Sequence, residues 1–152
     1  MNILTVLTKL AELEREAGRL YGRLATLFRD DPKASGFFRK LSEDEQRHYD
    51  LVKYQERIVR KSPADFGEVD ADLAAINRTL ASIAAFSRAT PSVAEAIRFS
   101  LDIETEIVES YAATVMKQSN QEFAEMVRGL TANFKEDHYQ QLVRFAGEYS
   151  AQ

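Results

Sequence analysis

Apolar residues recur along most of this 152-residue chain at alternating spacings of three and four, which is the period of an amphipathic α-helix. Turn and start signals divide the pattern: Asp31-Pro32 can cap and start a helix, residues 60–67 form a loop, Thr90-Pro91-Ser92 starts a helix, and Ser119-Asn120 is a turn. The pattern predicts helices over about residues 3–28, 32–59, 69–87, 91–117 and 121–149.

The helix predicted over 69–87 is shorter than the other four, and its apolar stripe contains no acid or histidine. Long helices joined by a short turn pack antiparallel, so the four long helices predict two hairpins. The shorter helix then lies in the connection between the hairpins. We therefore predict an all-α four-helix bundle with one long crossover, formed as a single domain by residues 1–152.

Acidic and histidine side chains interrupt the apolar stripes of the long helices. Glu14, Glu45, His48 and Glu104 each occupy a position that the spacing assigns to the buried face. In the charged run 43–47 only Glu45 is expected to turn inward. A carboxylate or imidazole in a core is costly unless it is paired or bound to a metal, so these positions are candidates for function.

The chain contains an internal repeat with an offset of 90 residues. Glu14-x-x-Ala17-x-x-x-Tyr21 recurs as Glu104-x-x-Ile107-x-x-x-Tyr111, and His48-Tyr49 recurs as His138-Tyr139. The repeat suggests two related hairpins around a pseudo-twofold axis. At roughly 1.5 Å per residue, the carboxylate and the histidine of each hairpin lie at similar depth from their turn, so they can meet across the bundle.

On these residues the sequence resembles the rubrerythrin-like branch of the ferritin-like superfamily. The resembling motifs are Glu14-x-x-Ala17-x-x-x-Tyr21-x-x-Leu24-Ala25, Leu41-x-x-x-Glu45-x-x-His48, Glu104 with Tyr111, and His138. The resemblance implies that Glu14, Glu45, His48, Glu104 and His138 are metal ligands, with Glu45 bridging two ions. Carboxylates and imidazoles suit iron, as one ion or two, or manganese. Tyr21 and Tyr111 are core tyrosines that can hydrogen-bond the ligand carboxylates.

One position departs from the family pattern. Three residues before His138 stands Lys135, where a second bridging Glu is expected, and an ammonium has no lone pair to offer a metal. In a competing alignment, Phe134 and Asp137 replace the Glu and the His; the His-Tyr repeat favours the first alignment. Glu136 or Asp137 could partly substitute for the missing carboxylate. Three states stay open: two metals with one bridge lost, one metal on Glu14, Glu45 and His48, or a metal-free Lys–Glu network.

Composition limits the kinds of binding partner and the cellular compartment that we expect for this protein. The net charge of −4 argues against nucleic acid as the main partner, and no apolar run approaches the ~20 residues that span a membrane. Residues 1–9 lack the basic leader and apolar core of a signal peptide, so a cytoplasmic location is expected. The absence of cysteine excludes disulfides and thiolate-bound metals.

Three functions are compatible with these features. The first is an oxidoreductase acting on peroxide or oxygen, whose electron donor is a separate protein because the chain lacks the cysteine-bound iron centre of rubrerythrins. The second is an iron oxidation or iron-handling protein. The third is a single-metal or metal-free bundle that serves as an interaction module. The resemblance also implies a homodimer.

Overall fold

The computed structural model describes residues 1–63, 65–117 and 120–150, and the side chains of these residues except 112, 113, 115–117 and 130–137. Its helices are α1 (Ile3–Leu27), α2 (Pro32–Lys61), α3 (Leu73–Phe86), α4 (Val93–Lys117) and α5 (Gln121–Ser150). The predicted all-α class is confirmed. In the described ranges the β-type pairing is limited to an isolated antiparallel bridge between Asn2 and Glu68.

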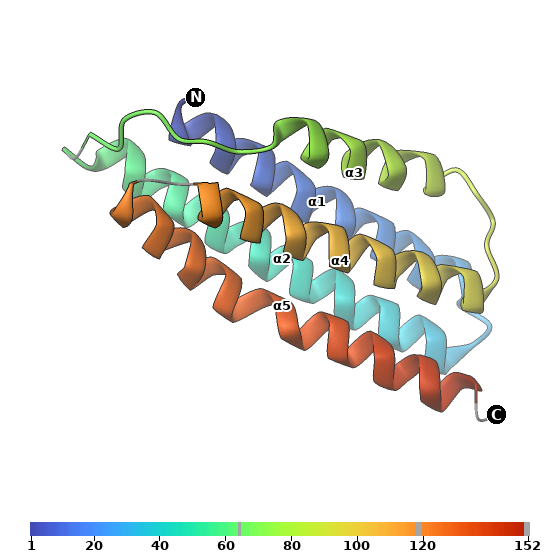
Figure 1. Ribbon diagram of the computed structural model, residues 1–152. Helices are drawn as coiled ribbons and strands as arrows, with labels where there is room; N and C mark the ends of the chain where they lie inside the picture. Colours follow the sequence, from blue (N-terminus) through green and yellow to red (C-terminus); the bar gives the residue numbers. More distant parts are fainter. Residues whose placement is uncertain (64, 118–119, 151–152) are drawn as a thin grey trace.

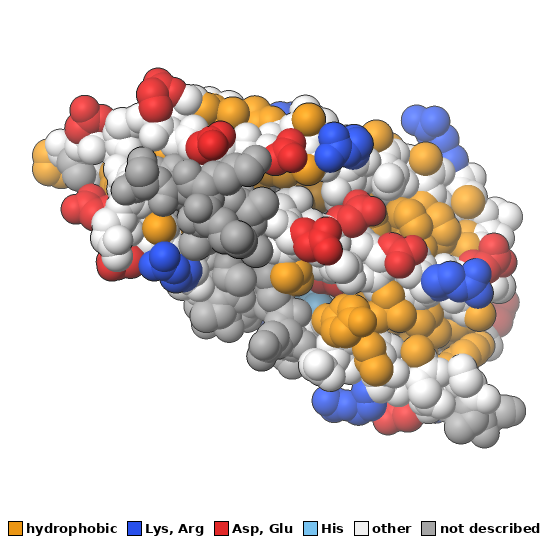
Figure 2. Space-filling model, viewed as in Figure 1, with side chains coloured by type: hydrophobic (Ala, Val, Ile, Leu, Met, Phe, Trp, Pro, Cys, Tyr) orange, Lys and Arg blue, Asp and Glu red, His pale blue; other side chains and the backbone are white. Residues whose placement is uncertain are grey.

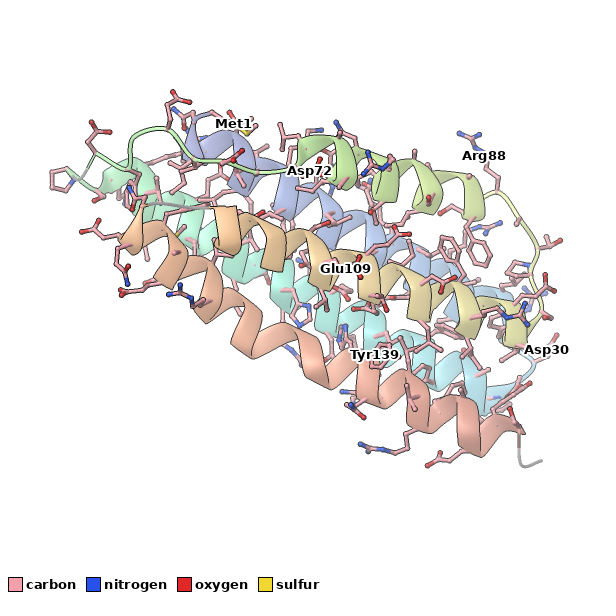
Figure 3. All side chains as sticks on the ribbon, viewed as in Figure 1. Met1, Asp30, Asp72, Arg88, Glu109 and Tyr139 are labelled. Atoms are coloured by element: carbon pink, nitrogen blue, oxygen red, sulfur yellow. The ribbon has the colours of Figure 1, made fainter. Side chains whose placement is uncertain are left out.

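The long helices form two antiparallel hairpins, α1 with α2 and α4 with α5 (Figure 1). Helix α3 lies along the bundle, packs against α1 and α4, and belongs to the connection between the hairpins. Asp30 and Arg88 lie towards one end of the molecule, and Met1 and Asp72 lie farther back along it (Figure 3). The long connection therefore brings the chain back along the bundle, so the second hairpin starts at the end where the first one turns.

Side-chain caps fix where the helices begin. Asp31 Oδ1 accepts from the Ala34 amide at 3.1 Å, and Pro32 occupies the first position of α2, as the sequence predicts. Similar bonds cap three further helices. The Ala75 amide donates to the Asp72 side chain at 2.9 Å at the start of α3, and the Phe123 amide donates to the Asn120 side chain at 3.1 Å at the start of α5. At the start of α4, the Glu95 amide donates to the Ser92 hydroxyl at 3.1 Å and the Ser92 amide donates to the Glu95 carboxylate at 3.2 Å. Such a cap contributes about 1 kcal/mol.

Helix α3 begins at Leu73, four residues later than the sequence predicts. The Val69 amide donates to the Met1 carbonyl at 2.8 Å, and Glu68 forms the bridge with Asn2. Val69 is buried, as its place in the apolar stripe suggests, but in a non-helical segment that pairs with the N-terminus. The prediction was wrong here because a contact distant in sequence satisfies this backbone.

The core is contributed by all five helices. The largest side chains that are essentially inaccessible include Tyr21, Tyr111, Phe38, Phe123, Leu10, Leu41, Ile76 and Ile83. Fully burying one such apolar side chain stabilises the fold by about 1.5–3 kcal/mol. Acidic side chains are scattered over the face that carries α3 and α4, and hydrophobic side chains gather towards the end with the α1–α2 turn (Figure 2). Among the described residues, no helix combines the length and apolarity that crossing a membrane requires.

Candidate metal centre

Three carboxylates and two histidines from the four long helices meet inside the bundle. Helix α1 contributes Glu14, α2 contributes Glu45 and His48, α4 contributes Glu104, and α5 contributes His138. Each of these residues is buried, with at most 8% of its surface exposed. The structure therefore brings together all five positions that the resemblance marks as ligands.

Glu45 lies at the centre of this cluster. Its Oε2 is 3.1 Å from His48 Nδ1, and its Oε1 is 2.9 Å from His138 Nδ1. On the outer side, His48 Nδ1 is 3.6 Å from Glu14 Oε2, and His138 Nδ1 is 3.5 Å from Glu104 Oε1. The cluster thus has two lobes that share Glu45, a first lobe with Glu14 and His48 and a second lobe with Glu104 and His138.

Two fully buried tyrosines fix the outer carboxylates across the bundle. The Tyr21 hydroxyl on α1 donates to Glu104 Oε1 on α4 at 2.6 Å, and the Tyr111 hydroxyl on α4 donates to Glu14 Oε1 on α1 at 2.7 Å. Burial and the neighbouring carboxylates raise the pKa of both phenols well above the usual value. Both tyrosines therefore stay neutral donors, and hydrogen bonds to charged acceptors are the stronger kind.

Asp44 is a residue of the site that the sequence analysis missed. Its side chain is buried, its Oδ2 lies 3.3 Å from His138 Nε2, and its Oδ1 pairs with Arg47. Asp44 would hold a proton on Nε2, which would leave Nδ1 of His138 as the ligand atom when a metal is bound. The expectation that only Glu45 of 43–47 turns inward was wrong. Asp44 lies four residues before His48, a core spacing that could have revealed it.

The carboxylates of the cluster cannot all be charged at low cost. Burial raises the pKa of Glu14, but bonds with Glu45, His48 and Tyr111 outweigh it and hold that pKa at about 2. Burial and the charges of Glu14 and Glu104 raise the pKa of Glu45 well above its usual range. Burial lowers the pKa of His138, but the adjacent Glu104 and Glu45 carboxylates raise it to about 9. The central carboxyl therefore tends to keep its proton, and a bound cation would remove that cost.

The donor set fits an iron or manganese ion. Oxygen and imidazole nitrogen ligands suit these metals, and both histidines turn Nδ1 towards the shared carboxylate. His138 Nδ1 is buried and, although close to two carboxylates, makes no hydrogen bond of acceptable angle within the described part of the chain. A buried ring nitrogen without a well-aligned hydrogen bond is available as a metal ligand. Glu45, His48 and His138 together offer ligand atoms within 4.8 Å of one another.

The sequence predicts that Lys135 replaces a bridging Glu three residues before His138. His138 lies in the cluster, as the first alignment expects. The backbone of 134–137 belongs to α5, but the side chains of Phe134, Lys135, Glu136 and Asp137 lie outside the described residues. The replacement of a second bridging Glu by Lys135 stays a prediction from the sequence.

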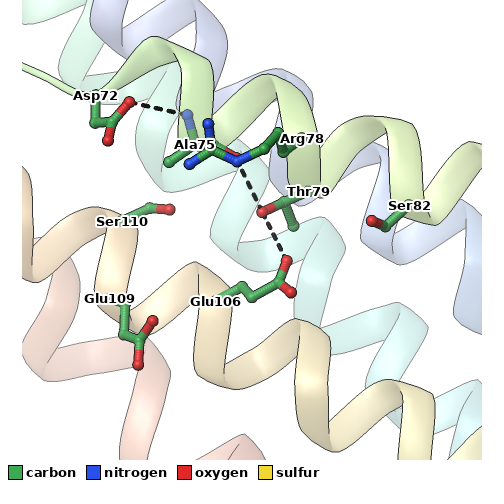
Figure 4. Close-up of a pocket in the computed structure, with 8 residues that line it drawn as sticks. All are labelled: Asp72, Ala75, Arg78, Thr79, Ser82, Glu106, Glu109 and Ser110. Atoms are coloured by element: carbon green, nitrogen blue, oxygen red, sulfur yellow. Dashed lines mark hydrogen bonds between the residues drawn. The ribbon is translucent and has the colours of Figure 1, made fainter.

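Two pockets lie between helices that carry cluster residues or pack against them. One, of about 530 Å³, lies between α3 and α4, where Thr79 donates to Glu106 at 2.9 Å (Figure 4). Its lining includes Asp72, Arg78 and Glu109 but no residue of the cluster. The other, of about 440 Å³, lies between α1 and α2 and includes Glu14 and Glu45. The cluster is therefore adjacent to a pocket, but not to the larger one.

No model of a known protein family matches this chain, and comparisons with curated proteins and with solved structures give no match either. The function of the protein is therefore inferred from the geometry of the cluster.

Proposed function

We propose that this protein is a ferritin-like metal protein that binds iron or manganese between Glu14, Glu45, His48, Glu104 and His138. The observation that carries the proposal is the central place of Glu45, whose two oxygens face the Nδ1 atoms of two different histidines at 3.1 and 2.9 Å. Each pair of facing atoms, together with one outer carboxylate, offers donor atoms to a cation. Di-metal carboxylate bundles use two glutamates and two Glu-x-x-His pairs, and this chain has that set except that Lys135 stands where the second paired Glu is expected.

The proposed activity is that of an oxidoreductase acting on peroxide or dioxygen. A bound iron or manganese ion supplies a one-electron redox couple and open coordination positions. The five buried cluster residues would hold that ion, the two tyrosines fix the outer carboxylates, and Asp44 contacts His138 on the ring nitrogen away from the cluster. A separate protein is proposed as the electron donor, because these 152 residues contain no cysteine to hold an iron centre of their own.

A metal-free bundle is the second candidate, and one observation favours it. The cluster can pair its charges without a metal, because protonated His138 would face Glu45 and Glu104 at ion-pair distances. In that case the same residues would serve the stability of an interaction module. Iron handling uses the same metal-bound state as the first proposal and differs in releasing the oxidised metal.

Anaerobic titration of the metal-free protein with Fe²⁺ and with Mn²⁺, followed by metal analysis, tests the proposal. Wild-type protein should bind metal, and its melting temperature should rise with metal concentration. Glu45→Ala should weaken binding by on the order of 100-fold or more, because it removes the shared ligand. Glu109→Ala removes an exposed acid of α4 that lies outside the cluster and its pocket; it is the matched control and should bind normally.

Substoichiometric metal together with unchanged melting temperatures would reject the metal proposal and favour the metal-free bundle. If metal binds, repeated additions of hydrogen peroxide with an external reductant separate the two metal functions. An oxidoreductase consumes many equivalents and keeps its metal, whereas an iron-handling protein reacts once and releases ferric iron.

A further inference from the structure

The pocket between α1 and α2 ends on the metal cluster. Two of its lining residues are Glu14 and Glu45, which are only 2% and 1% exposed. The remaining lining residues belong to the surface-facing parts of the same two helices, among them Gly18, Gly22 and Ser42. This pocket therefore reaches from the surface of the first hairpin to two residues of the cluster, one of them the shared Glu45.

Two glycines one helical turn apart line this pocket, where α1 and α2 pack closely. A Cβ atom on Gly18 would lie 3.1 Å from the Cβ of Glu45, and one on Gly22 would lie 3.3 Å from Ser42 Oγ. Ser42 Oγ also donates to the Gly18 carbonyl at 2.8 Å, which holds the two helices close together. In the second hairpin the corresponding positions, 90 residues later, are Val108 and Ala112, so the repeat did not keep the glycines there.

The charges around the pocket favour a cation over an anion. At the rim, Arg19 pairs with Glu16 at 2.9 Å and Arg15 approaches the same carboxylate at 3.4 Å, while Glu43 faces them from α2. These four rim charges cancel. Two of the lining residues, Glu14 and Glu45, are acids of the cluster, so a cation that enters gains in attraction as it moves inward.

We propose that this pocket is the access route by which a divalent metal ion reaches the cluster, with Glu14 and Glu45 as the first ligands that the ion meets. The inference rests on the proposed metal function. A usable metal site needs a route through the protein as well as ligands. A route changes the rates of binding and release by the same factor and leaves the dissociation constant unchanged, whereas a ligand changes the dissociation constant.

Stopped-flow mixing of the metal-free protein with Co²⁺, followed by its visible absorption, measures these rates. Gly22→Ala and Gly22→Val place a side chain in the pocket without touching a ligand. Gly22→Val should slow both binding and release by roughly tenfold, equivalent to a barrier about 1.4 kcal/mol higher, with Gly22→Ala in between. Gly36→Ala on α2 has no atom within 4 Å of its new methyl group and should leave both rates unchanged.

A second variant tests the route without altering the helix packing. Arg19 is exposed at the rim, and Arg19→Gln should speed the binding of Co²⁺ by about threefold at low ionic strength, with the difference disappearing in high salt. Arg144→Gln makes the same charge change on an exposed position of α5 and should not alter the rate.

The outcomes separate the two proposals. Wild-type protein that takes up no Co²⁺ overturns the metal function itself. Normal uptake with wild-type rates in the Gly22 and Arg19 variants overturns only the route. An altered dissociation constant in Gly22→Ala with an unchanged binding rate also overturns the route, because the glycine would then act on the ligands.

Discussion

The two hairpins carry the same repeat, but they contribute unequally to the cluster. The first hairpin supplies Glu14, Glu45 and His48, and it also holds Asp44 against the histidine of its neighbour. Of the five cluster residues, the second hairpin supplies only Glu104 and His138. Position 135, which the 90-residue offset relates to Glu45, is a lysine.

Helix packing explains why the shared carboxylate comes from the first hairpin. Gly18 lets α2 approach α1 so closely that the Cβ of Glu45 lies against the glycine, and the bond from Ser42 fixes this approach. Val108 stands at the related position of α4. The outer ligands are thus common to both copies of the repeat, whereas the central ligand depends on a close helix contact that one copy provides.

Lys135→Glu is the strongest test of this inequality. Restoring the acid at the position related to Glu45 should raise the capacity for Fe²⁺ from about one ion per chain to about two, because it completes the set of two glutamates and two Glu-x-x-His pairs. The alignment predicts that the added acid joins Glu45 and Glu104 in the core, so the metal-free variant should melt at a lower temperature. Metal analysis and thermal unfolding measure both effects.

Lys40→Glu makes the same charge change on an exposed position of α2 and serves as the control. It should leave capacity and melting temperature near those of the wild type. A wild-type capacity of about two ions, unchanged in Lys135→Glu, would contradict the unequal contribution of the hairpins.

The two buried tyrosines give a smaller and more local test. Tyr111→Phe removes the donor to Glu14 in the first lobe, and Tyr21→Phe removes the donor to Glu104 in the second lobe. If the first lobe binds the tighter ion, Tyr111→Phe should weaken the affinity for that ion by about tenfold. Tyr21→Phe should leave this affinity unchanged and should weaken only the binding of the second ion in the Lys135→Glu protein. Calorimetric titration measures the two affinities separately.

Tyr54→Phe changes an exposed tyrosine of α2 and should leave both affinities unchanged. Equal losses in Tyr21→Phe and Tyr111→Phe for a single bound ion would show that the two lobes act as one site.

The helix caps at the two hairpin turns give the smallest expected difference. Asp31 caps α2, and bonds from the Ala34 amide and from the Tyr149 hydroxyl lower the pKa of its carboxyl group. A lowered pKa stabilises the fold above the unfolded value near ~4, and the contribution is lost as the pH falls through the lower folded value. Asn120, the cap of α5, does not titrate.

Thermal unfolding between pH 7 and pH 3 checks this prediction. The difference in melting temperature between the wild type and Asp31→Asn should shrink as the pH falls below about 4. An equally large difference at pH 3 would show that the Asp31 carboxylate is not responsible for the difference.

Local spacing predicted the helices well, since the apolar stripes and the Asp31-Pro32 signal depend on neighbouring residues. It also predicted that Glu45 and His48 turn inward. It failed where distant parts of the chain decide the outcome. Val69 is held in a non-helical segment by the N-terminus, and Asp44 is buried because His138 reaches it from α5.

The crossed tyrosine bonds have a consequence for how the molecule assembles. Each tyrosine donates to the glutamate of the other hairpin, so a hairpin alone would carry both an unsatisfied acid and an unsatisfied hydroxyl. Two identical hairpins placed face to face would satisfy both bonds by symmetry. The single chain thus resembles a symmetric dimer of hairpins whose two halves are connected through α3. Each hairpin needs the other for its buried tyrosine and glutamate to be hydrogen-bonded in the folded protein.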